Sequence, residues 1–445
     1  MEGWGPEYRS RTGTLTKVFT PELVDAAVAK HGRGELRRRL LPARLVVYLV
    51  LALCLFVRES YEEVISLLTS GIPDSRALAR VNRSSLCRAR IRLGEEVLKT
   101  VFRQVTGPLA ATETPGAWWR GLRFLALDGT QFDVPDSVSN GDTFDGPSTG
   151  GAPFGFPQVR AAVLAEIGTH AVLDAGLGGY RDGERCLAYP LASSTGPGDH
   201  LVIADRGFWS VEFVHAFTAS GAHLPVTLQS SHLGTTQAEL PDGSRLSLTR
   251  PGKDVRLRAA REGRVLPEET TYRVITFTKD DKVVRLGASL LDTEHYPADE
   301  LIALYRQRWE IELIFDEIKD HLGPGGPLRS RFLKSCGGNC GPLLAVHQAV
   351  RRSTHAAAAD GSAVDADRLS YLRCVRIARR SVPSQHDTSS RRLTSAWKEA
   401  AQEAHARLLP PRSGRDWPPR DQEADAVADS GNPQRPHQGR AGSVG

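Results

Sequence analysis

Two aspartates, Asp128 and Asp205, each come directly after a short apolar run that predicts a β-strand, at 124–127 and 201–204. In an α/β sheet, ligands gather at the carboxyl ends of the strands. Two carboxylates at neighbouring strand ends repel each other unless cations lie between them, and hard oxygen ligands of this kind suit Mg²⁺ or Mn²⁺. The alternative is that both aspartates only cap helices or fix turns.

A long helix, predicted from Pro297 to Gly323, carries further polar side chains of the right types. At 100° per residue, four of them share a stripe about 60° wide: Tyr305, Arg308, Glu312 and Lys319. Glu312 could supply a third carboxylate to a metal, and Arg308 and Lys319 could hold phosphates. The alternative is a solvated face with salt bridges such as Arg308 with Glu312.

Other acidic residues nearby are poorer candidates. Glu310 and Glu317 fall well off the polar stripe of the long helix. Four aspartates lie in a loop rich in Gly, Ser and Pro, where aspartate usually forms turns: Asp133, Asp136, Asp142 and Asp145. We therefore do not expect any of these six to bind metal.

The elements that precede the first aspartate read as short helices from Pro21 to about Phe102. One of them, predicted over 85–98 with Asn82 or Ser84 as its cap, displays three arginines: Arg88, Arg90 and Arg92. Short helices ending in a basic one resemble a helix-turn-helix unit, so this helix is a candidate for DNA contact. The alternative is an ordinary solvated basic helix.

Composition bounds the remaining possibilities. The chain has 445 residues, 40% hydrophobic and 24% charged, which allows a buried core and about three domain-sized units. Six cysteines exclude a disulfide scaffold and favour a reducing compartment. The longest apolar run, 45–57, is shorter than the about 20 residues that a membrane span needs.

Charge is distributed unevenly along the chain. Residues 1–100 carry 17 Lys and Arg against 11 Asp and Glu, and residues 351–412 carry 12 against 6, so each region is +6. The tail from Ser413 is −1 and the net charge is +5, so 101–350 is −6. An acidic middle between basic flanks suits a cation-binding core held on a polyanion, although chance surface patterning gives the same numbers.

Between the helical ends, the sequence predicts a mixed α/β region. Further strands are expected at 158–166 and 170–177, a helix at 211–220, and a β-rich stretch at 224–292. That stretch includes a predicted hairpin of Tyr272–Thr278 with Val283–Leu291. Past Pro410, the composition has no period and predicts a disordered tail.

The four residues of the polar stripe match the sequence signature of a known protein family. Tyr-x2-Arg-x3-Glu-x6-Lys resembles the signature of bacterial DDE transposases of the insertion-element-four family. Five further segments are similar to that family as well. Three lie in the predicted α/β region or just beyond the long helix: Asp128-Gly129-Thr130, Asp205-Arg206-Gly207-Phe208 and Leu328-Arg329-Ser330. Two lie near the N-terminus: Leu40-Leu41-Pro42-Ala43 and Ser60-Tyr61-Glu62-Glu63-Val64. The likeness covers roughly residues 13–410.

The resemblance implies a fold and a domain order. The fold is α/β, with a ribonuclease-H-like catalytic core over 120–345 that contains a β-rich insertion at about 224–295. A helical N-terminal DNA-binding domain over 13–105 precedes the core. A helical basic C-terminal region over 346–410 follows it, and 411–445 is expected to be disordered.

It also implies a chemistry. Asp128, Asp205 and Glu312 would be the catalytic, metal-binding residues, holding two Mg²⁺ ions about 3.5–4 Å apart for in-line phosphoryl transfer, with Mn²⁺ as a possible substitute. Tyr305, Arg308 and Lys319 would grip phosphates near the cut. The partners would be the inverted-repeat ends of the protein's own element and target DNA, bound by a homodimer on paired ends. No membrane and no nucleotide cofactor are expected, and the location is cytoplasmic, on the nucleoid when DNA is bound.

Two departures from the family leave alternatives open. Some members close a DNA hairpin with a base stacked on an insertion-domain tryptophan. In this chain no Trp lies between Trp209 and Trp309, and Tyr272 is the candidate substitute. The sequence of 331–341 is also unlike the family and suggests a local frameshift, with true divergence or coincidence as the alternative. The alternatives to an active transposase are therefore a metal-dependent nuclease without strand transfer and a catalytically impaired DNA-binding relic.

Overall fold

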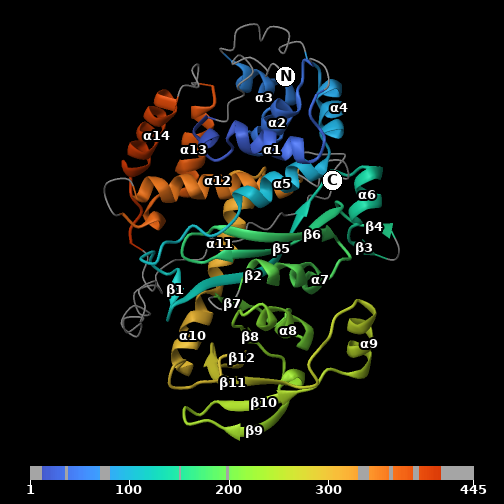
Figure 1. The fold of residues 1–445 in the computed structure, drawn as a ribbon, viewed down its shortest axis with the longest axis vertical. Helices are drawn as coiled ribbons and strands as arrows, with labels where there is room; N and C mark the ends of the chain where they lie inside the picture. The colour runs from blue at the N-terminus through green and yellow to red at the C-terminus, as the bar shows by residue number, and fades with distance from the viewer. Residues whose placement is uncertain are drawn as a thin grey trace, which may run out of the picture.

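A computed structural model describes residues 13–35, 39–70, 81–149, 152–196, 200–328, 340–359, 364–383 and 390–411. Within these residues, ten strands form one sheet, ordered β6-β5-β2-β7-β8-β12-β11-β10-β9, with β1 paired to β2. The strands that position the site are β2 (Leu122–Asp133), β5 (Gln158–Glu166), β6 (Val172–Gly179), β7 (His200–Ala204) and β8 (Pro225–Thr227). Strands β2, β7 and β8 run parallel, while β5 and β6 are antiparallel to their neighbours. The expected mixed α/β core is confirmed (Figure 1).

Strand β2 is apolar on both faces because both faces of the sheet are covered. Alternate side chains of a strand point to opposite faces. Phe124 and Ala126 belong to the larger hydrophobic core, while Leu125 and Leu127 belong to a second core with α8 (Val211–Ala219). The predicted strand 124–127 is too short, because antiparallel pairing with β5 continues to Asp133.

The β-rich insertion continues the same sheet instead of forming a layer of its own. Its strands are β9 (Thr235–Glu239), β10 (Arg245–Thr249), β11 (Thr270–Lys279) and β12 (Lys282–Ala288), and α9 (Lys253–Arg261) crosses between β10 and β11. The predicted hairpin is confirmed as β11–β12. Asp280 and Asp281 turn it with positive φ, which short polar residues tolerate in turns.

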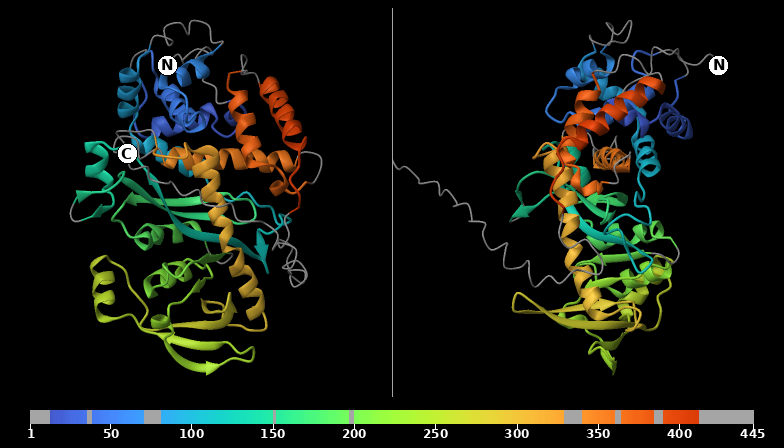
Figure 2. Two further views of the ribbon diagram at one scale, coloured as in Figure 1. Left: turned by 180° about the vertical axis from the view of Figure 1, so that it is seen from behind. Right: turned by 90° about the vertical axis from the view of Figure 1, so that its left-hand side faces the viewer.

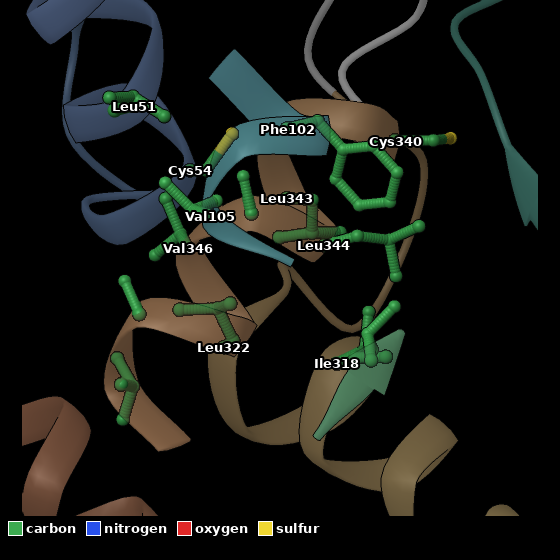
Figure 3. Packing of buried hydrophobic residues seen from close by; sticks show 14 of the residues in the cluster. Leu51, Cys54, Phe102, Val105, Ile318, Leu322, Cys340, Leu343, Leu344 and Val346 are labelled. Carbon is green, nitrogen blue, oxygen red and sulfur yellow. The ribbon is translucent and has the colours of Figure 1, made fainter. Parts of the chain in front are cut away.

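The helices at both ends of the chain share one core. The N-terminal helices are α1 (Pro21–Lys30), α2 (Ala43–Leu55), α3 (Tyr61–Thr69), α4 (Arg83–Leu93) and α5 (Glu95–Val105). They pack with α12 (Cys340–Ala359), α13 (Tyr371–Ser381) and α14 (Ser390–His405). Figure 3 shows Leu51 and Phe102 of the N-terminal helices beside Leu343 and Val346 of α12.

The single helix predicted over 85–98 is wrong. Gly94, at φ 79°, ends α4 and begins α5. Glycine takes this backbone conformation readily and other residues do so at a cost. The cap was predicted correctly, since the Asn82 side chain accepts a hydrogen bond from the Ser85 N–H.

The predicted long helix is a helical run of four segments, Ala298–Leu322. They are α10 (Ala298–Arg306), a 3₁₀ turn (Gln307–Trp309), α11 (Glu310–Asp316) and a π-helical turn (Glu317–Leu322). The run crosses the molecule from the insertion to α12 (Figure 2). The predicted frameshift over 331–341 falls mostly on residues outside those described, as does the tail from 412. No helix in the described ranges has the length and apolarity of a membrane span.

Candidate active site

Asp128 and Asp205 are neighbours because of strand register. The parallel pairing of β2 with β7 ends at Leu127 opposite Ala204, so the next residue on each chain is an aspartate. Asp128 lies inside β2, not at its end as predicted, but it stands where the pairing with β7 stops. Side-chain alternation places Asp128 on the same face as Phe124 and Ala126, which is the face that the helical run covers.

Arg308, a residue of the helical run, connects that run to Asp128. Its Nη1 donates to Asp128 Oδ2 at 2.8 Å, and its Nη2 donates to Glu312 Oε1 at 3.2 Å. Glu312 is 61% exposed, so it lies at the rim of the site. The predicted Arg308–Glu312 pair therefore exists, and it also reaches one of the aspartates.

The electrostatics of the site favour a cation. Burial raises the pKa of Asp128 to about 6, and the charges of Asp205 and Glu184 act in the same direction. The Gly129 N–H and the Arg308 guanidinium oppose this rise by stabilising the carboxylate. Glu184 belongs to the opposite face of the sheet, because its carboxylate fills the space where a Cβ of Gly129 would stand.

The donor set fits hard divalent cations, since it consists of carboxylate oxygens. Among the residues that the structure describes, no three such side chains already stand together as metal ligands. Arg308 supplies positive charge between Asp128 and Glu312 in this arrangement. A metal at this site therefore requires Glu312, Arg308 or both to adjust.

Tyr305 lies at the edge of a basic pocket. Its hydroxyl is 3.0 Å from Thr227 Oγ1 of β8, and burial raises the pKa of this phenol. The pocket, of about 440 Å³, lies between the β11–β12 hairpin and α10, and its polar and aromatic lining includes Arg206, Lys279, Arg285, Arg306, Arg308, Phe277, Tyr305 and Trp309. Within the described part of the chain, no acidic side chain lines it, so it suits an anion. Neither Thr227 nor this pocket was predicted from the sequence.

Lys319 sits apart from the other three residues of the stripe. Its ammonium lies 5.6 Å from the ring of Phe132, four residues beyond Asp128 on β2. Burial lowers the pKa of Lys319. Its contact with the end of β2 places it further along the strand than Arg308.

The three arginines predicted to contact DNA differ in their exposure to solvent. Arg88 is exposed, and Arg92 donates to the Leu41 carbonyl at 2.7 Å while remaining exposed. Arg90 is only 4% exposed and donates to the Tyr61 hydroxyl at 2.6 Å. The prediction that Arg90 contacts DNA is therefore wrong, because this side chain is buried among the N-terminal helices.

Tyr272 is also wrong as a stacking platform. It is fully buried, its hydroxyl donates to the His232 carbonyl at 2.7 Å, and its ring packs edge-on against Trp209 at 4.8 Å. A base cannot reach a side chain in that position. Trp309, 49% exposed, is an accessible aromatic residue at the basic pocket.

Comparison with known proteins gives consistent matches. The family model "Insertion element 4 transposase N-terminal" matches residues 9–103, and "Transposase DDE domain" matches residues 119–335. The transposase InsG for insertion sequence element IS4 of Escherichia coli K12 is 30% identical over 317 residues, which is 70% of this chain and 69% of that protein. The putative transposase InsZ of the same organism is 25% identical over 203 residues, or 45% and 66% of the two chains.

Among solved structures, a piggyBac transposase synaptic complex with hairpin DNA matches over 90% of this chain and 85% of that one. The TM-score is 0.46 and the sequence identity is 11%.

Proposed function

Because this chain belongs to the DDE transposases of the insertion element 4 family, we propose that Asp128, Asp205 and Glu312 are its catalytic carboxylates. Family membership makes the protein a DNA transposase with a ribonuclease-H-like core, an enzyme that cleaves and transfers DNA strands. The observation that supports the three residues best is the register of β2 and β7, which makes Asp128 and Asp205 neighbours. Arg308 then links Asp128 to Glu312.

DDE transposase domains generally use divalent metals, and we propose two Mg²⁺ ions here, with Mn²⁺ able to substitute. Bound ions of this kind lower the pKa of an attacking water or 3′-hydroxyl and stabilise the leaving oxygen. Asp128, Asp205 and Glu312 would hold them through carboxylate oxygens. No nucleophilic Ser, Cys or Tyr is required, because the attacking oxygen belongs to water or DNA.

The DNA strand at the cut would be held by the cations around the site. When Arg308 gives up its contact with a carboxylate, its planar guanidinium is free to bind a phosphate through two hydrogen bonds. Tyr305 and the other cations of the basic pocket would hold adjacent phosphates. Lys319 would contact DNA further along β2, beside Phe132.

DNA-end recognition would lie in the N-terminal domain over 13–105, through exposed Arg88 and Arg92. The catalytic domain over 120–345, with its insertion at about 224–295, would perform the cut, and the basic region 346–410 would add contacts to phosphates. A homodimer would hold two inverted-repeat ends together with target DNA.

Three substitutions test the assignment. Asp128→Asn, Asp205→Asn and Glu312→Gln should each abolish Mg²⁺-dependent cutting of duplexes copied from the DNA that flanks the gene. Binding of those duplexes should persist, because Lys and Arg contacts to phosphates dominate affinity. Asp316→Asn, at an exposed position one turn beyond Glu312, is the matched control and should cut normally.

Robust cutting by Glu312→Gln would show that the third carboxylate is a different residue. Joining of a 3′-hydroxyl end to a target plasmid distinguishes a complete transposase from a nuclease without strand transfer. Binding with neither reaction would identify this chain as an impaired relic.

A further inference from the structure

A buried polar cluster lies behind the proposed active site, on the side of the helical run away from solvent. Its members come from three parts of the chain, and none is more than 6% exposed: His170, Glu310, Glu317, His347 and Arg351. None of them is a proposed catalytic residue, and burial keeps His347 and Arg351 away from the phosphates that the region 346–410 is proposed to contact. Two carboxylates at this depth require a reason beyond packing.

One imidazole contacts both carboxylates. His170 Nε2 is 3.0 Å from Glu310 Oε2, and His170 Nδ1 is 3.0 Å from Glu317 Oε1. Glu310 is the first residue of α11, and Glu317 is the first residue after it. His170 therefore lies against both ends of the segment that bears Glu312.

The cluster is tied to the rest of the molecule on two sides. His170 lies in the short connection between β5 and β6, with φ 56°. Because both strands belong to the central sheet, His170 is fixed to that sheet. From α12, His347 Nε2 and Arg351 Nε both lie 2.9 Å from Glu317 Oε2. Burial lowers the pKa of His347 to about 3, so its ring is neutral and donates to Glu317 from Nε2.

Arg351 completes the arrangement. Its Nη2 is 2.7 Å from His170 Nδ1, and it donates to Glu317 as well. A neutral His170 accepts from Arg351 at Nδ1 and donates to Glu310 from Nε2, and Glu317 is then held by Arg351 and His347. A protonated His170 donates to Glu317 from Nδ1 and to Glu310 from Nε2. In both protonation states, Glu310 receives a hydrogen bond from the His170 ring.

Such a cluster contributes direction more than net stability. Replacing buried ion pairs by well-packed apolar residues is often neutral or stabilising, and the apolar contacts of this run are non-directional. The run also changes its twist on both sides of α11, at the 3₁₀ turn Gln307–Trp309 and the π turn Glu317–Leu322. Directional hydrogen bonds at both ends of α11 fix the rotation of the segment between those changes.

We propose that Glu310 and Glu317 are positioning residues, which act through the buried histidines and Arg351 to fix α11 so that Glu312 and Arg308 face Asp128 and Asp205. This inference rests on the proposed function, in which Glu312 is a catalytic carboxylate. The cluster is buried, so its effect would be the orientation of the residues that are proposed to contact DNA and metal.

The test compares two kinds of damage to the same segment in the full-length protein. Glu310→Leu removes the acceptor for His170, Glu310→Gln keeps an acceptor without the charge, and Ile314→Ala removes only packing, because Ile314 is a fully buried residue of α11. For each variant we would measure the melting temperature, the affinity for gene-flanking duplexes, the single-turnover cleavage rate with Mg²⁺, and hydrogen exchange of the α11 amides.

Glu310→Leu should slow cleavage about 10- to 100-fold while leaving DNA affinity unchanged, since a misplacement of about 1 Å has effects of this size. Its α11 amides should exchange faster than those of the parent. Ile314→Ala should cleave normally wherever it is folded, and Glu310→Gln should retain most of the parental rate. If Glu310→Leu cleaves like Ile314→Ala at matched loss of melting temperature, the cluster is only structural and the inference is wrong.

Glu312→Gln, measured in parallel, separates this inference from the proposed function. An inactive Glu312→Gln beside a fully active Glu310→Leu overturns the positioning inference alone. An active Glu312→Gln overturns the assignment of Glu312, and the exchange rates of the α11 amides in Glu310→Leu then decide whether the cluster fixes this segment.

Discussion

At the scale of single residues, Asp128 combines burial with neighbouring negative charge. Its pKa is raised from 3.8 to about 6, so the folded state binds a proton more tightly than the unfolded state does. Between those two values the folded state holds more protons, and stability falls as pH rises through this window. The titration of Asp128 should therefore make the free energy of unfolding lower above pH 6 than below pH 4, by up to about 3 kcal/mol.

This is measurable by urea unfolding between pH 4 and 7 without divalent cations. The stability of Asp128→Asn relative to the parent should increase as pH rises through the window, because asparagine does not titrate. Asp142→Asn, at an exposed position in α6 (Val138–Phe144), is the control and should show no such trend. A constant difference between Asp128→Asn and the parent would contradict the buried-charge explanation.

In the metal-free protein, the positive charge of Arg308 offsets the negative charges of Asp128 and Glu312. Arg308→Gln should destabilise the metal-free protein by about 1–3 kcal/mol, because it leaves a partly buried carboxylate without its charged partner. Mg²⁺ should restore part of this loss if the cation takes over the compensation. Melting temperatures in EDTA and in Mg²⁺ measure both effects, with Arg306→Gln, an exposed neighbour in the basic pocket, as the control. Equal losses in the two variants would show that Arg308 has no special role.

At the scale of elements, α4 carries an exposed arginine that is proposed to contact DNA, Arg88, and a buried arginine, Arg90. Arg88→Ala should weaken DNA binding and lower the slope of log affinity against log salt by about one, as the loss of one phosphate contact does. Arg90→Ala should leave that slope unchanged but lower stability by about 1–3 kcal/mol, since it leaves the buried Tyr61 hydroxyl without its donor. Fluorescence anisotropy over a salt series, with thermal melts, tests the pair. A smaller salt slope in Arg90→Ala would return Arg90 to the DNA interface.

At the scale of the whole molecule, the two ends of the chain form one helical unit. The N-terminal helices α2 and α5 bury side chains against α12, which comes more than two hundred residues later (Figures 1 and 3). A fragment of residues 1–105 should therefore fail to fold cooperatively, because it exposes the surface that α12 covers. Circular dichroism during thermal melting measures this, and a sharp transition in the isolated fragment would contradict it.

The same packing predicts a long-range effect of a C-terminal substitution. Leu344 is fully buried, so Leu344→Ala should cost about 2–5 kcal/mol of folding free energy. Hydrogen exchange should increase in α2 and α5 as well as in α12, because they share one core. Ala356→Gly, at an exposed position of α12, is a control that should weaken α12 by about 1 kcal/mol through helix propensity alone. Faster exchange confined to α12 in Leu344→Ala would show that the two ends are independent.

The sequence by itself determined the features that depend on local pattern. The 3.6-residue period placed Tyr305, Arg308 and Glu312 on one side of a helix, with Glu310 and Glu317 away from them. The apolar runs before Asp128 and Asp205 marked neighbouring strands, and the signature around Glu312 identified the family. These inferences succeeded because residues near each other in the chain share the geometry of one element.

The tertiary structure alone decided what depends on partners distant in the chain. Pairing with β5 extended β2 past Asp128, and the packing of α3 against α4 buried Arg90 beneath Tyr61. Lys319 lies within a π segment and after a 3₁₀ turn, so a helical wheel of constant twist could not place it. Glu310 and Glu317 gave no sign of their role, because the residues that satisfy them, His170, His347 and Arg351, lie 30 or more positions away. Periodicity shows which face a residue occupies, but only the folded chain shows what that face meets.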